Sequence, residues 1–178
     1  MSFAEADAAE PEITVWEGKF IAAKTRGRWE YVSRTRGMKA AVIFAVEDGH
    51  VLLVEQYRVP LGRPCLELPA GLVGDHEEGE DPLLAAGREL EEETGWRADT
   101  LTDLGEYYSS PGVISESFTL VRATGLTQIG AGGGVEGEGI TPHRVALTDL
   151  PDFIAAKRAD GCAIDMKVTV LMASALLP

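Results

Sequence analysis

Three glutamates, Glu89, Glu92 and Glu93, stand close together near the middle of the chain. Their spacing of three and four residues puts the carboxylates on one face of a helix. Like charges at these spacings repel one another, and the C-terminal end of a helix dipole disfavours anions. Grouped carboxylate oxygens suit a hard cation such as Mg²⁺ or Mn²⁺. The alternative is a solvated acidic face that binds nothing.

The residues around this cluster predict the helix that would carry it. Asp81 suits the N-cap, Pro82 suits the first helical position, and Gly95 suits the exit. The apolar residues on the neighbouring face are Leu83, Ala86 and Leu90. The sequence therefore predicts an amphipathic helix between Asp81 and Gly95 with an acidic face.

Charge is unevenly distributed over the 178 residues, whose formal net charge is −13. Residues 77–93 contain eight acids and one arginine, whereas residues 16–39 contain seven bases and two acids. This contrast predicts a cation site beside an anion site. The net negative charge disfavours nucleic acid and anionic membranes as partners.

Composition favours one globular domain, with 45% hydrophobic and 25% charged residues. No apolar run approaches the ~18 residues that span a bilayer. The first twelve residues are small and acidic and do not resemble a secretory signal. Two cysteines, Cys65 and Cys162, make no framework of disulfides, so we expect a reduced protein in the cytoplasm.

The remaining pattern predicts strands around the acidic helix and two helices at the end of the chain. Asp48-Gly49 predicts a hairpin, and Thr25-Arg26-Gly27 predicts a turn. The expected helices cover residues 150–159 and 165–177, and Pro69-Ala70-Gly71 is expected to end a strand. The expected strands cover residues 13–22, 29–34, 40–46, 51–57, 65–68, 101–108, 118–123 and 141–147.

We expect an α/β fold, a mixed sandwich with an N-terminal β extension. Residues 1–12 are expected to be a disordered acidic tail. Residues 13–38 would form the β extension, and residues 39–178 would form the main domain.

The acidic helix lies within the pattern G-x5-E-x7-R-E-U-x-E-E-x-G-U, where U is bulky and apolar, from Gly74 to Trp96. All nine specified positions are filled, and the pattern resembles the signature of the Nudix hydrolases. The resemblance implies an α/β/α sandwich with a mixed sheet. It also implies that Glu89, Glu92 and Glu93 hold Mg²⁺ or Mn²⁺ against a substrate diphosphate. Arg88 would pair with a nearby carboxylate such as Glu80.

Residues outside the signature resemble the ADP-ribose pyrophosphatases. These are the segments 29–34, 55–58, 66–71 and 109–112, with Pro111 fifteen residues after Trp96. The resemblance implies Mg²⁺-dependent hydrolysis of ADP-ribose to AMP and ribose 5-phosphate by a homodimer. It implies nucleotide binding and dimerisation for residues 13–38 and catalysis for residues 39–178. It implies that Ala70 offers its carbonyl to a metal. The residues it places at the substrate are Trp29, Glu30, Arg34, Phe20, Arg58 and Glu116.

The segment 130–139 contains six glycines, and its only charged residues are Glu136 and Glu138. Pro142 and a β-like run follow it, which excludes a dinucleotide-binding fingerprint because that motif needs a helix there. The segment is either a flexible surface loop or, as the resemblance implies, the carrier of a mobile carboxylate that activates water. The sequence leaves open which glutamate would be the base.

Two other functions remain possible from the sequence. One is hydrolysis of another nucleoside diphosphate sugar, such as GDP-mannose or ADP-glucose, because few residues bear on recognition of the base. The other is a nucleotide-sensing module without activity, although such a module has no need of the costly glutamate cluster. In each case the partner is a small molecule.

Overall fold

The computed structural model describes residues 2–74 and 79–172. The helices are α1 (Phe3–Ala8), α2 (Pro82–Thr94) and α3 (Leu150–Ala159), with short 3₁₀ helices η1 (Thr35–Gly37), η2 (Val59–Leu61) and η3 (Met166–Met172). The strands are β1 (Ile13–Glu17), β2 (Ile21–Arg26), β3 (Trp29–Arg34), β4 (Lys39–Glu47), β5 (His50–Arg58), β6 (Arg63–Glu67), β7 (Ala70–Val73), β8 (Trp96–Tyr108), β9 (Ser117–Gln128), β10 (Thr141–Ala146) and β11 (Ala163–Ile164).

Within these described residues the strands form two sheets. The smaller sheet is antiparallel and has the order β1-β2-β3. The larger has eight strands, including the order β11-β6-β5-β4-β9-β8, with β10 beside β5 and β7 beside β4. It is mixed, because β4 runs parallel to β9 and β11 parallel to β6, whereas the other pairs are antiparallel.

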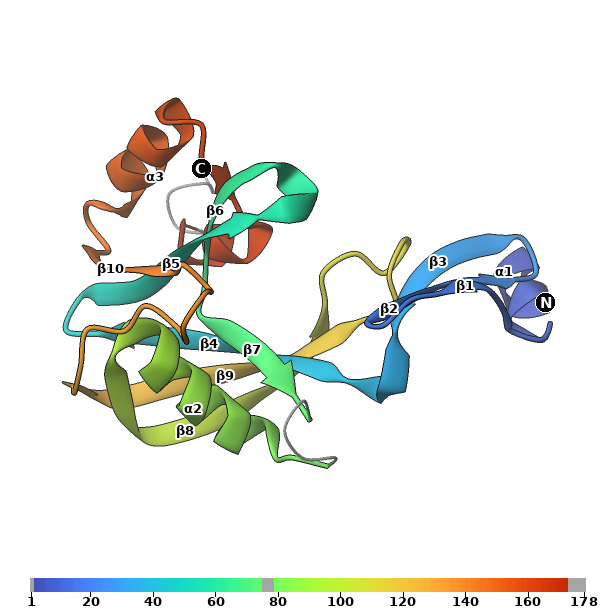
Figure 1. Cartoon of the computed structure of the whole chain (residues 1–178), viewed down its shortest axis with the longest axis horizontal. Coiled ribbons are helices and arrows are strands. Elements are labelled where there is room, and N and C mark those ends of the chain that lie inside the picture. The colour runs from blue at the N-terminus through green and yellow to red at the C-terminus, as the bar shows by residue number, and fades with distance from the viewer. Residues whose placement is uncertain (1, 75–78, 173–178) are drawn as a thin grey trace.

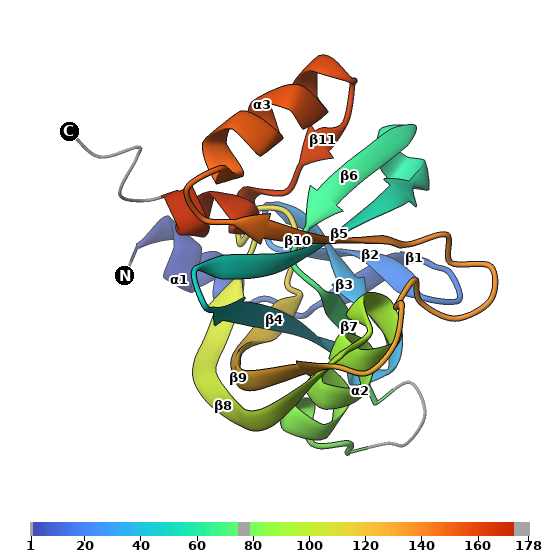
Figure 2. The ribbon, with the colours of Figure 1, turned by 90° about the vertical axis from the view of Figure 1, so that its left-hand side faces the viewer.

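Helices α2 and α3 cover the larger sheet from opposite sides (Figures 1 and 2). Strand β4 shows how the sequence supports this, because successive side chains point to opposite faces. Ala41 and Ile43 pack in one buried cluster with Leu90 of α2, whereas Val42 packs in a second cluster with Ile154 of α3. A strand with two covered faces is expected to be apolar, as β4 is between its charged end residues Lys39 and Glu47. The predicted α/β/α sandwich is confirmed.

The predicted hairpin turn at Asp48-Gly49 is confirmed, whereas the turn predicted at Thr25-Arg26-Gly27 begins only at Gly27, because Thr25 and Arg26 end strand β2. Asp48 and Gly49 both have positive φ, 50° and 69°, and they join β4 to β5 through the pair Glu47–His50. Two consecutive residues with positive φ are what a type I′ hairpin turn requires. Gly27, with φ of 56°, lies in the turn between β2 and β3.

The N-terminal sheet projects from the body that contains the larger sheet (Figure 1). Val32 joins it to the body, because its N–H donates to Val113 O at 2.9 Å and its carbonyl accepts from Ser115 N at 3.0 Å. The prediction of a single strand over residues 13–22 is wrong. The chain turns after β1, and Gly18 N donates to Ile21 O at 2.9 Å to close that turn.

The prediction of disorder for residues 1–12 also differs from the structure, since residues 3–8 form helix α1. A capping box starts this helix, with Ser2 and Glu5 each accepting a hydrogen bond from the other's backbone N–H. Asp7 then forms an ion pair with Arg28 at 2.9 Å, which fastens α1 to the turn between β2 and β3. The acidic composition of this segment predicted neither the helix cap nor the ion pair with Arg28.

The predicted α-helix over residues 165–177 is a 3₁₀ helix over Met166–Met172, and residues 173–178 lie outside the described residues. Asp165 caps it by accepting the Lys167 N–H at 2.7 Å, and Val168 is fully buried. Pro69-Ala70-Gly71 leads directly into a further strand, β7, which the sequence did not predict. In the part of the chain that the structure describes, no helix has the length and apolarity needed to cross a membrane.

Candidate active site

Helix α2 begins and ends as predicted. The Asp81 carboxylate accepts the Leu83 N–H at 2.9 Å, Pro82 opens the helix, and Gly95 closes it with φ of 74°. Its apolar face is fully buried against the larger sheet, through Ala85, Ala86 and Leu90. Burial of this face fixes the orientation of the adjoining acidic face.

Two of the three glutamates lie against the start of β7. The Ala70 N–H donates to Glu93 Oε2 at 2.9 Å. A Cβ at Gly71 would lie 2.0 Å from the carboxyl carbon of Glu89, so the Glu89 side chain packs directly on the glycine backbone and would have to move to admit a side chain there. The unpredicted strand β7 therefore brings the Ala70–Gly71 backbone against the acidic helix.

Arg88 lies among the carboxylates. Its guanidinium is 2.8 Å from Glu89, 3.6 Å from Glu92 and 3.7 Å from Glu80. Glu80 also accepts the Gly74 N–H at 3.1 Å. The structure thus contains the Arg88–Glu80 contact that the resemblance implied, and this contact links the loop after β7 to α2.

Glu93 is only 6% exposed. Burial raises the pKa of its carboxyl group to about 8, and the nearby charges of Glu89 and Glu138 add to this effect. The hydrogen bond from Ala70 and the charge of Arg58 act in the opposite direction. A buried carboxyl with a raised pKa gains most from a neighbouring cation, which would stabilise its ionised form.

These residues fit a hard divalent cation. The candidate donors are carboxylate oxygens, with the Ala70 carbonyl as a neutral oxygen nearby, and no histidine or thiolate belongs to the set. Among the described residues no three acidic, His or Cys side chains converge as a finished cage. Arg88 instead contacts Glu89 and Glu92. A cation would take over the charge neutralisation that Arg88 now provides, and it would replace the proton that burial favours on Glu93.

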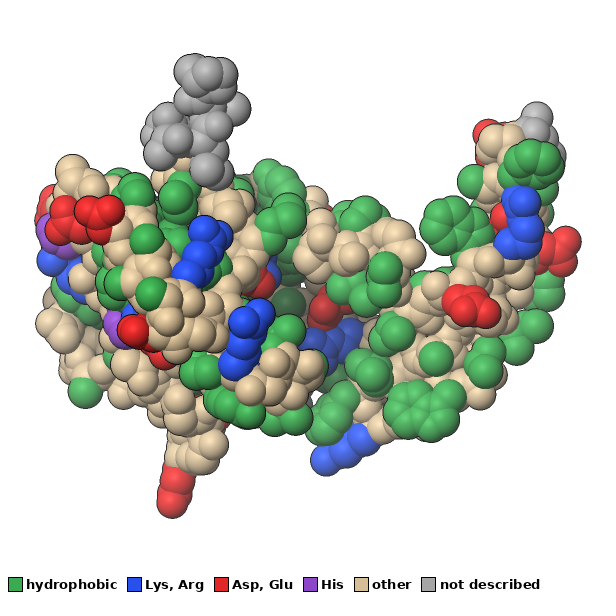
Figure 3. Space-filling view, turned by 90° about the horizontal axis from the view of Figure 1, so that it is seen from above, with side chains coloured by type: hydrophobic (Ala, Val, Ile, Leu, Met, Phe, Trp, Pro, Cys, Tyr) green, Lys and Arg blue, Asp and Glu red, His purple; other side chains and the backbone are tan. Residues whose placement is uncertain are grey.

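A cleft of about 550 Å³ opens beside this site. Four predicted site residues line it, namely Arg34, Arg58, Ala70 and Glu116. Arg34 pairs with Glu116 at 2.6 Å, and Arg58 forms two hydrogen bonds with Glu67, at 2.6 and 2.9 Å. Figure 3 shows a hollow between the body and the N-terminal extension where basic and acidic side chains lie together.

The sequence analysis missed three charged residues of this cleft, Glu67, Asp165 and Lys167. Glu67 is 8% exposed, and the signal for it was a lone acid in the apolar run 66–68. Asp165 and Lys167 pair at 2.7 Å and reach the cleft because β11 joins the edge of the sheet beside β6. Nothing local in the sequence predicts that pairing.

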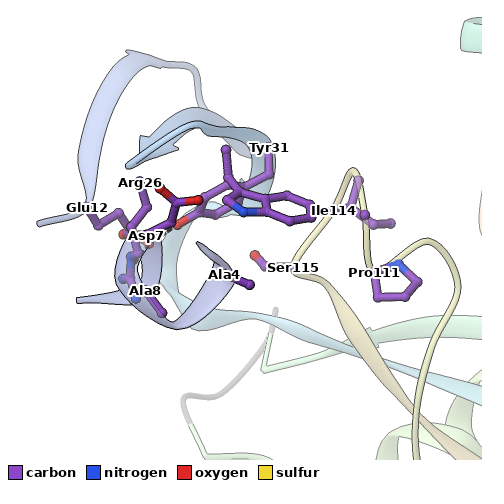
Figure 4. A pocket seen from close by; sticks show the side chains of 11 residues that line it. Ala4, Asp7, Ala8, Glu12, Arg26, Tyr31, Pro111, Ile114 and Ser115 are labelled. Atoms are coloured by element: carbon purple, nitrogen blue, oxygen red, sulfur yellow. Dashed lines mark hydrogen bonds and ion pairs between the residues drawn. The ribbon is translucent and has the colours of Figure 1, made fainter. Parts of the chain in front are cut away.

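Trp29 lies in a different cavity of about 500 Å³, between the N-terminal extension and the loop before β9. In Figure 4, Arg26 and Tyr31 of the extension lie across this cavity from Pro111 and Ile114 of that loop. One copy of the chain therefore places Trp29 apart from the cleft that contains Arg58.

Glu30 and Phe20 do not share the Trp29 cavity. Glu30 alternates with Trp29 along β3 and lines another hollow, beside Val32 and Val15. Phe20 is 53% exposed and contacts the Lys19 ammonium, 4.9 Å from its ring centroid. The assignment of these residues to the substrate stays a prediction.

The glycine-rich segment is bound to the end of α2 by backbone hydrogen bonds. Gly133 N donates to Glu93 O and Gly134 N to Glu92 O, both at 2.9 Å. These carbonyls belong to the last turn of the helix and have no partner within it. A Cβ at Gly132 would lie 2.6 Å from Glu93 O and would overlap Thr94, so glycine permits this contact. The segment thus caps the helix that carries the glutamates.

The two charged residues of this segment differ in their surroundings. The Glu138 carboxylate accepts the Val135 N–H at 2.9 Å, and the Glu138 carbonyl accepts Gln56 Nε2 at 3.3 Å. Val135 follows Gly134, whose N–H donates to the Glu92 carbonyl, so these hydrogen bonds hold the Glu138 carboxylate at the end of α2, where its charge adds to the raised pKa of Glu93. Glu136 is exposed. The structure therefore brings Glu138 to the acidic helix.

The fold and the site define a class. It is an α/β/α sandwich in which a capped acidic helix lies beside a cleft whose arginines pair with glutamates. The sequence profile of the NUDIX domain matches residues 35–158. The chain belongs to the Nudix family.

Similar proteins include enzymes that act on nucleoside diphosphate sugars. The ADP-ribose pyrophosphatase of Bacillus subtilis is 45% identical over 76 residues, which cover 43% of this chain and 40% of that protein. The GDP-mannose pyrophosphatase of Cronobacter sakazakii is 36% identical over 147 residues, which cover 77% and 72%. A solved structure described as an ADP compounds hydrolase has a TM-score of 0.64 and 25% identity, covering 82% of this chain and 80% of its own.

The matched region is only a part of several curated relatives. The alignments span 63% of the methanol dehydrogenase activator of Bacillus methanolicus, 40% of the ADP-ribose pyrophosphatase of Bacillus subtilis and 44% of that of Mycobacterium tuberculosis.

Proposed function

We propose that this chain hydrolyses the diphosphate bond of ADP-ribose, with Mg²⁺, to give AMP and ribose 5-phosphate. The observation that carries the proposal is the placement of Glu89 and Glu93 against the Ala70–Gly71 backbone, which lines the same cleft as Arg58. The similarity to ADP-ribose pyrophosphatase supports the choice of substrate.

The cation would be held by Glu89, Glu92 and Glu93 together with the Ala70 carbonyl. A divalent ion at this position supplies charge neutralisation for a diphosphate and acidifies a water molecule, and Mn²⁺ offers the same chemistry. Arg88 positions these carboxylates through its contacts with Glu89 and Glu92.

Arg58 binds the diphosphate in this proposal. Glu67 accepts from Arg58 Nε and Nη2, which leaves other guanidinium N–H donors for phosphate oxygens. The side chain of Arg58 is 41% exposed and therefore accessible to a ligand in the cleft. Arg34 and Glu116 form an ion pair that lines the same cleft, and they would contact the substrate next to the diphosphate.

Glu138 is the general base in this proposal, and Glu136 is not. The Glu138 carboxylate accepts the Val135 N–H, next to the Gly134 N–H that donates to the Glu92 carbonyl, and its charge raises the pKa of Glu93. The Glu138 carboxylate would give up its hydrogen bond with Val135 and take a proton from the attacking water.

We also propose a homodimer formed through the N-terminal extension. Its strand β1 exposes large apolar side chains, with Val15 66% and Trp16 57% exposed. Apolar surface of this kind favours association with a second copy. A cytoplasmic location is supported by the two cysteines, which are both free thiols.

The test is a substrate panel with Mg²⁺, in which the products are separated by chromatography. We expect the highest kcat/KM for ADP-ribose, with AMP and ribose 5-phosphate released in equal amounts. A preference for GDP-mannose or ADP-glucose would establish the second candidate, which the similarity to GDP-mannose pyrophosphatase favours. Binding of ADP-ribose without release of AMP would instead identify a nucleotide sensor.

A further inference from the structure

Asp165 and Lys167 form a fixed charged pair on the wall of the cleft. The Asp165 N–H donates to Leu66 O at 2.9 Å, which continues the pairing of β11 with β6. Its carboxylate accepts the Lys167 backbone N–H through Oδ1 and Lys167 Nζ through Oδ2, both at 2.7 Å. Because the carboxylate is held at both oxygens and at its backbone, the pair is ordered before any ligand arrives.

Lys167 is also held from its other side. Its ammonium lies 5.7 Å from the ring centroid of Phe118, which lines the same cleft. An ammonium has three N–H donors, and in the described part of the chain Asp165 takes one of them. The side chain is 24% exposed. Lys167 therefore presents donors to a ligand in the cleft.

The charges on this cleft indicate what such a ligand would be. Its basic residues, Arg34, Arg58 and Lys167, are each paired with an acidic residue, respectively Glu116, Glu67 and Asp165. The paired lining has no net charge. A lysine beside an aspartate offers donors and acceptors together, which suits hydroxyl groups because each one both donates and accepts.

We propose that Asp165 and Lys167 form the subsite for the distal sugar of a nucleoside diphosphate sugar and bind its hydroxyl groups. The inference rests on the proposed function, which places the diphosphate at Ala70 and Arg58. Both of these residues line the same cleft as the pair, whereas Trp29 lines the other cavity. The cleft beyond the diphosphate is then available for the sugar.

The test measures product binding directly, with Mg²⁺ present, by calorimetry. Ribose 5-phosphate contains the distal sugar and AMP does not. We expect Lys167→Met to weaken the Kd of ribose 5-phosphate about tenfold, the effect of losing a hydrogen bond from a charged group, and to leave the Kd of AMP unchanged. With ADP-ribose as substrate, KM should rise by a similar factor while kcat stays within about twofold.

Lys157→Met is the matched control. Lys157 also pairs with a carboxylate, Glu55 at 2.5 Å, lies 5.5 Å from the ring of Phe153, and is 22% exposed. It does not line the cleft. We expect wild-type Kd values for both products, so the control separates loss of a sugar contact from loss of a lysine–carboxylate pair.

Asp165→Asn keeps an acceptor but removes the charge that orients Lys167, and we expect an intermediate loss of ribose 5-phosphate affinity with normal AMP binding. Wild-type ribose 5-phosphate binding in Lys167→Met would overturn the proposal, as would failure of the wild-type protein to bind ribose 5-phosphate. If the wild-type protein binds ribose 5-phosphate in a Lys167-dependent manner but does not hydrolyse ADP-ribose, only the proposed function fails.

Discussion

Replacing Glu93 by glutamine should stabilise the metal-free protein at neutral pH. The folded state raises the pKa of this carboxyl from its ordinary value of 4.5 to about 8, chiefly by burial. Below pH 4.5 the group is protonated in both states and no stability is lost. Between the two pKa values only the unfolded state is ionised, so stability falls as pH rises. At ~1.4 kcal/mol per pH unit, the loss at pH 7 is about 3 kcal/mol.

Chemical denaturation in EDTA at pH 5, 6 and 7 measures this effect. Glutamine can still accept the Ala70 N–H but does not titrate. We expect Glu93→Gln to exceed the wild-type free energy of unfolding by less than about 1 kcal/mol at pH 5 and by about 3 kcal/mol at pH 7. Glu91→Gln is the control on the same helix, because Arg97 lowers the pKa of Glu91. This control should show no gain in stability at any of the three pH values.

Addition of Mg²⁺ should reverse the order. The wild-type protein should gain stability and release a proton at pH 7, because the cation replaces the proton on Glu93, whereas Glu93→Gln should gain much less. If the stability difference between the two proteins stays constant from pH 5 to pH 7, the reasoning about the burial of Glu93 is wrong.

Three further outcomes are expected. Glu138→Gln should lower kcat by about 10²-fold, the scale of a lost general base, while Glu136→Gln keeps wild-type turnover; equal effects would refute the assignment of Glu138. Gly132→Ala should lower kcat and stability because its Cβ meets the end of α2. Gly139 has a similar positive φ but open space around it, so Gly139→Ala is the control that measures backbone strain alone. Sedimentation should give twice the mass of one chain, and a monomer would contradict the proposed dimer.

Local signals in the sequence predicted helix α2 and the glutamates that it carries. Asp81 and Gly95 define the ends of α2, and the signature spacing identifies its glutamates, because capping and helical periodicity depend on neighbours in the chain. The hairpin at Asp48-Gly49 was predictable for the same reason. These features need no tertiary contact to be specified.

Features that depend on distant pairing were not predictable. Strand β7 looked like the end of a strand, yet its pairing with β4 positions Ala70 against Glu93. Lys167 enters the cleft only because β11 pairs with β6. The loop of six glycines had the composition of a flexible linker, but its backbone N–H groups cap α2 at the carbonyls of Glu92 and Glu93. Composition does not report such partners.

The most direct test of the central claim is the release of AMP from ADP-ribose with Mg²⁺, after chelation by EDTA, and after Mg²⁺ is restored. We predict activity that disappears with EDTA and returns with Mg²⁺ or Mn²⁺, because the glutamates of α2 act only through a divalent cation. Undiminished release of AMP in EDTA would contradict the account.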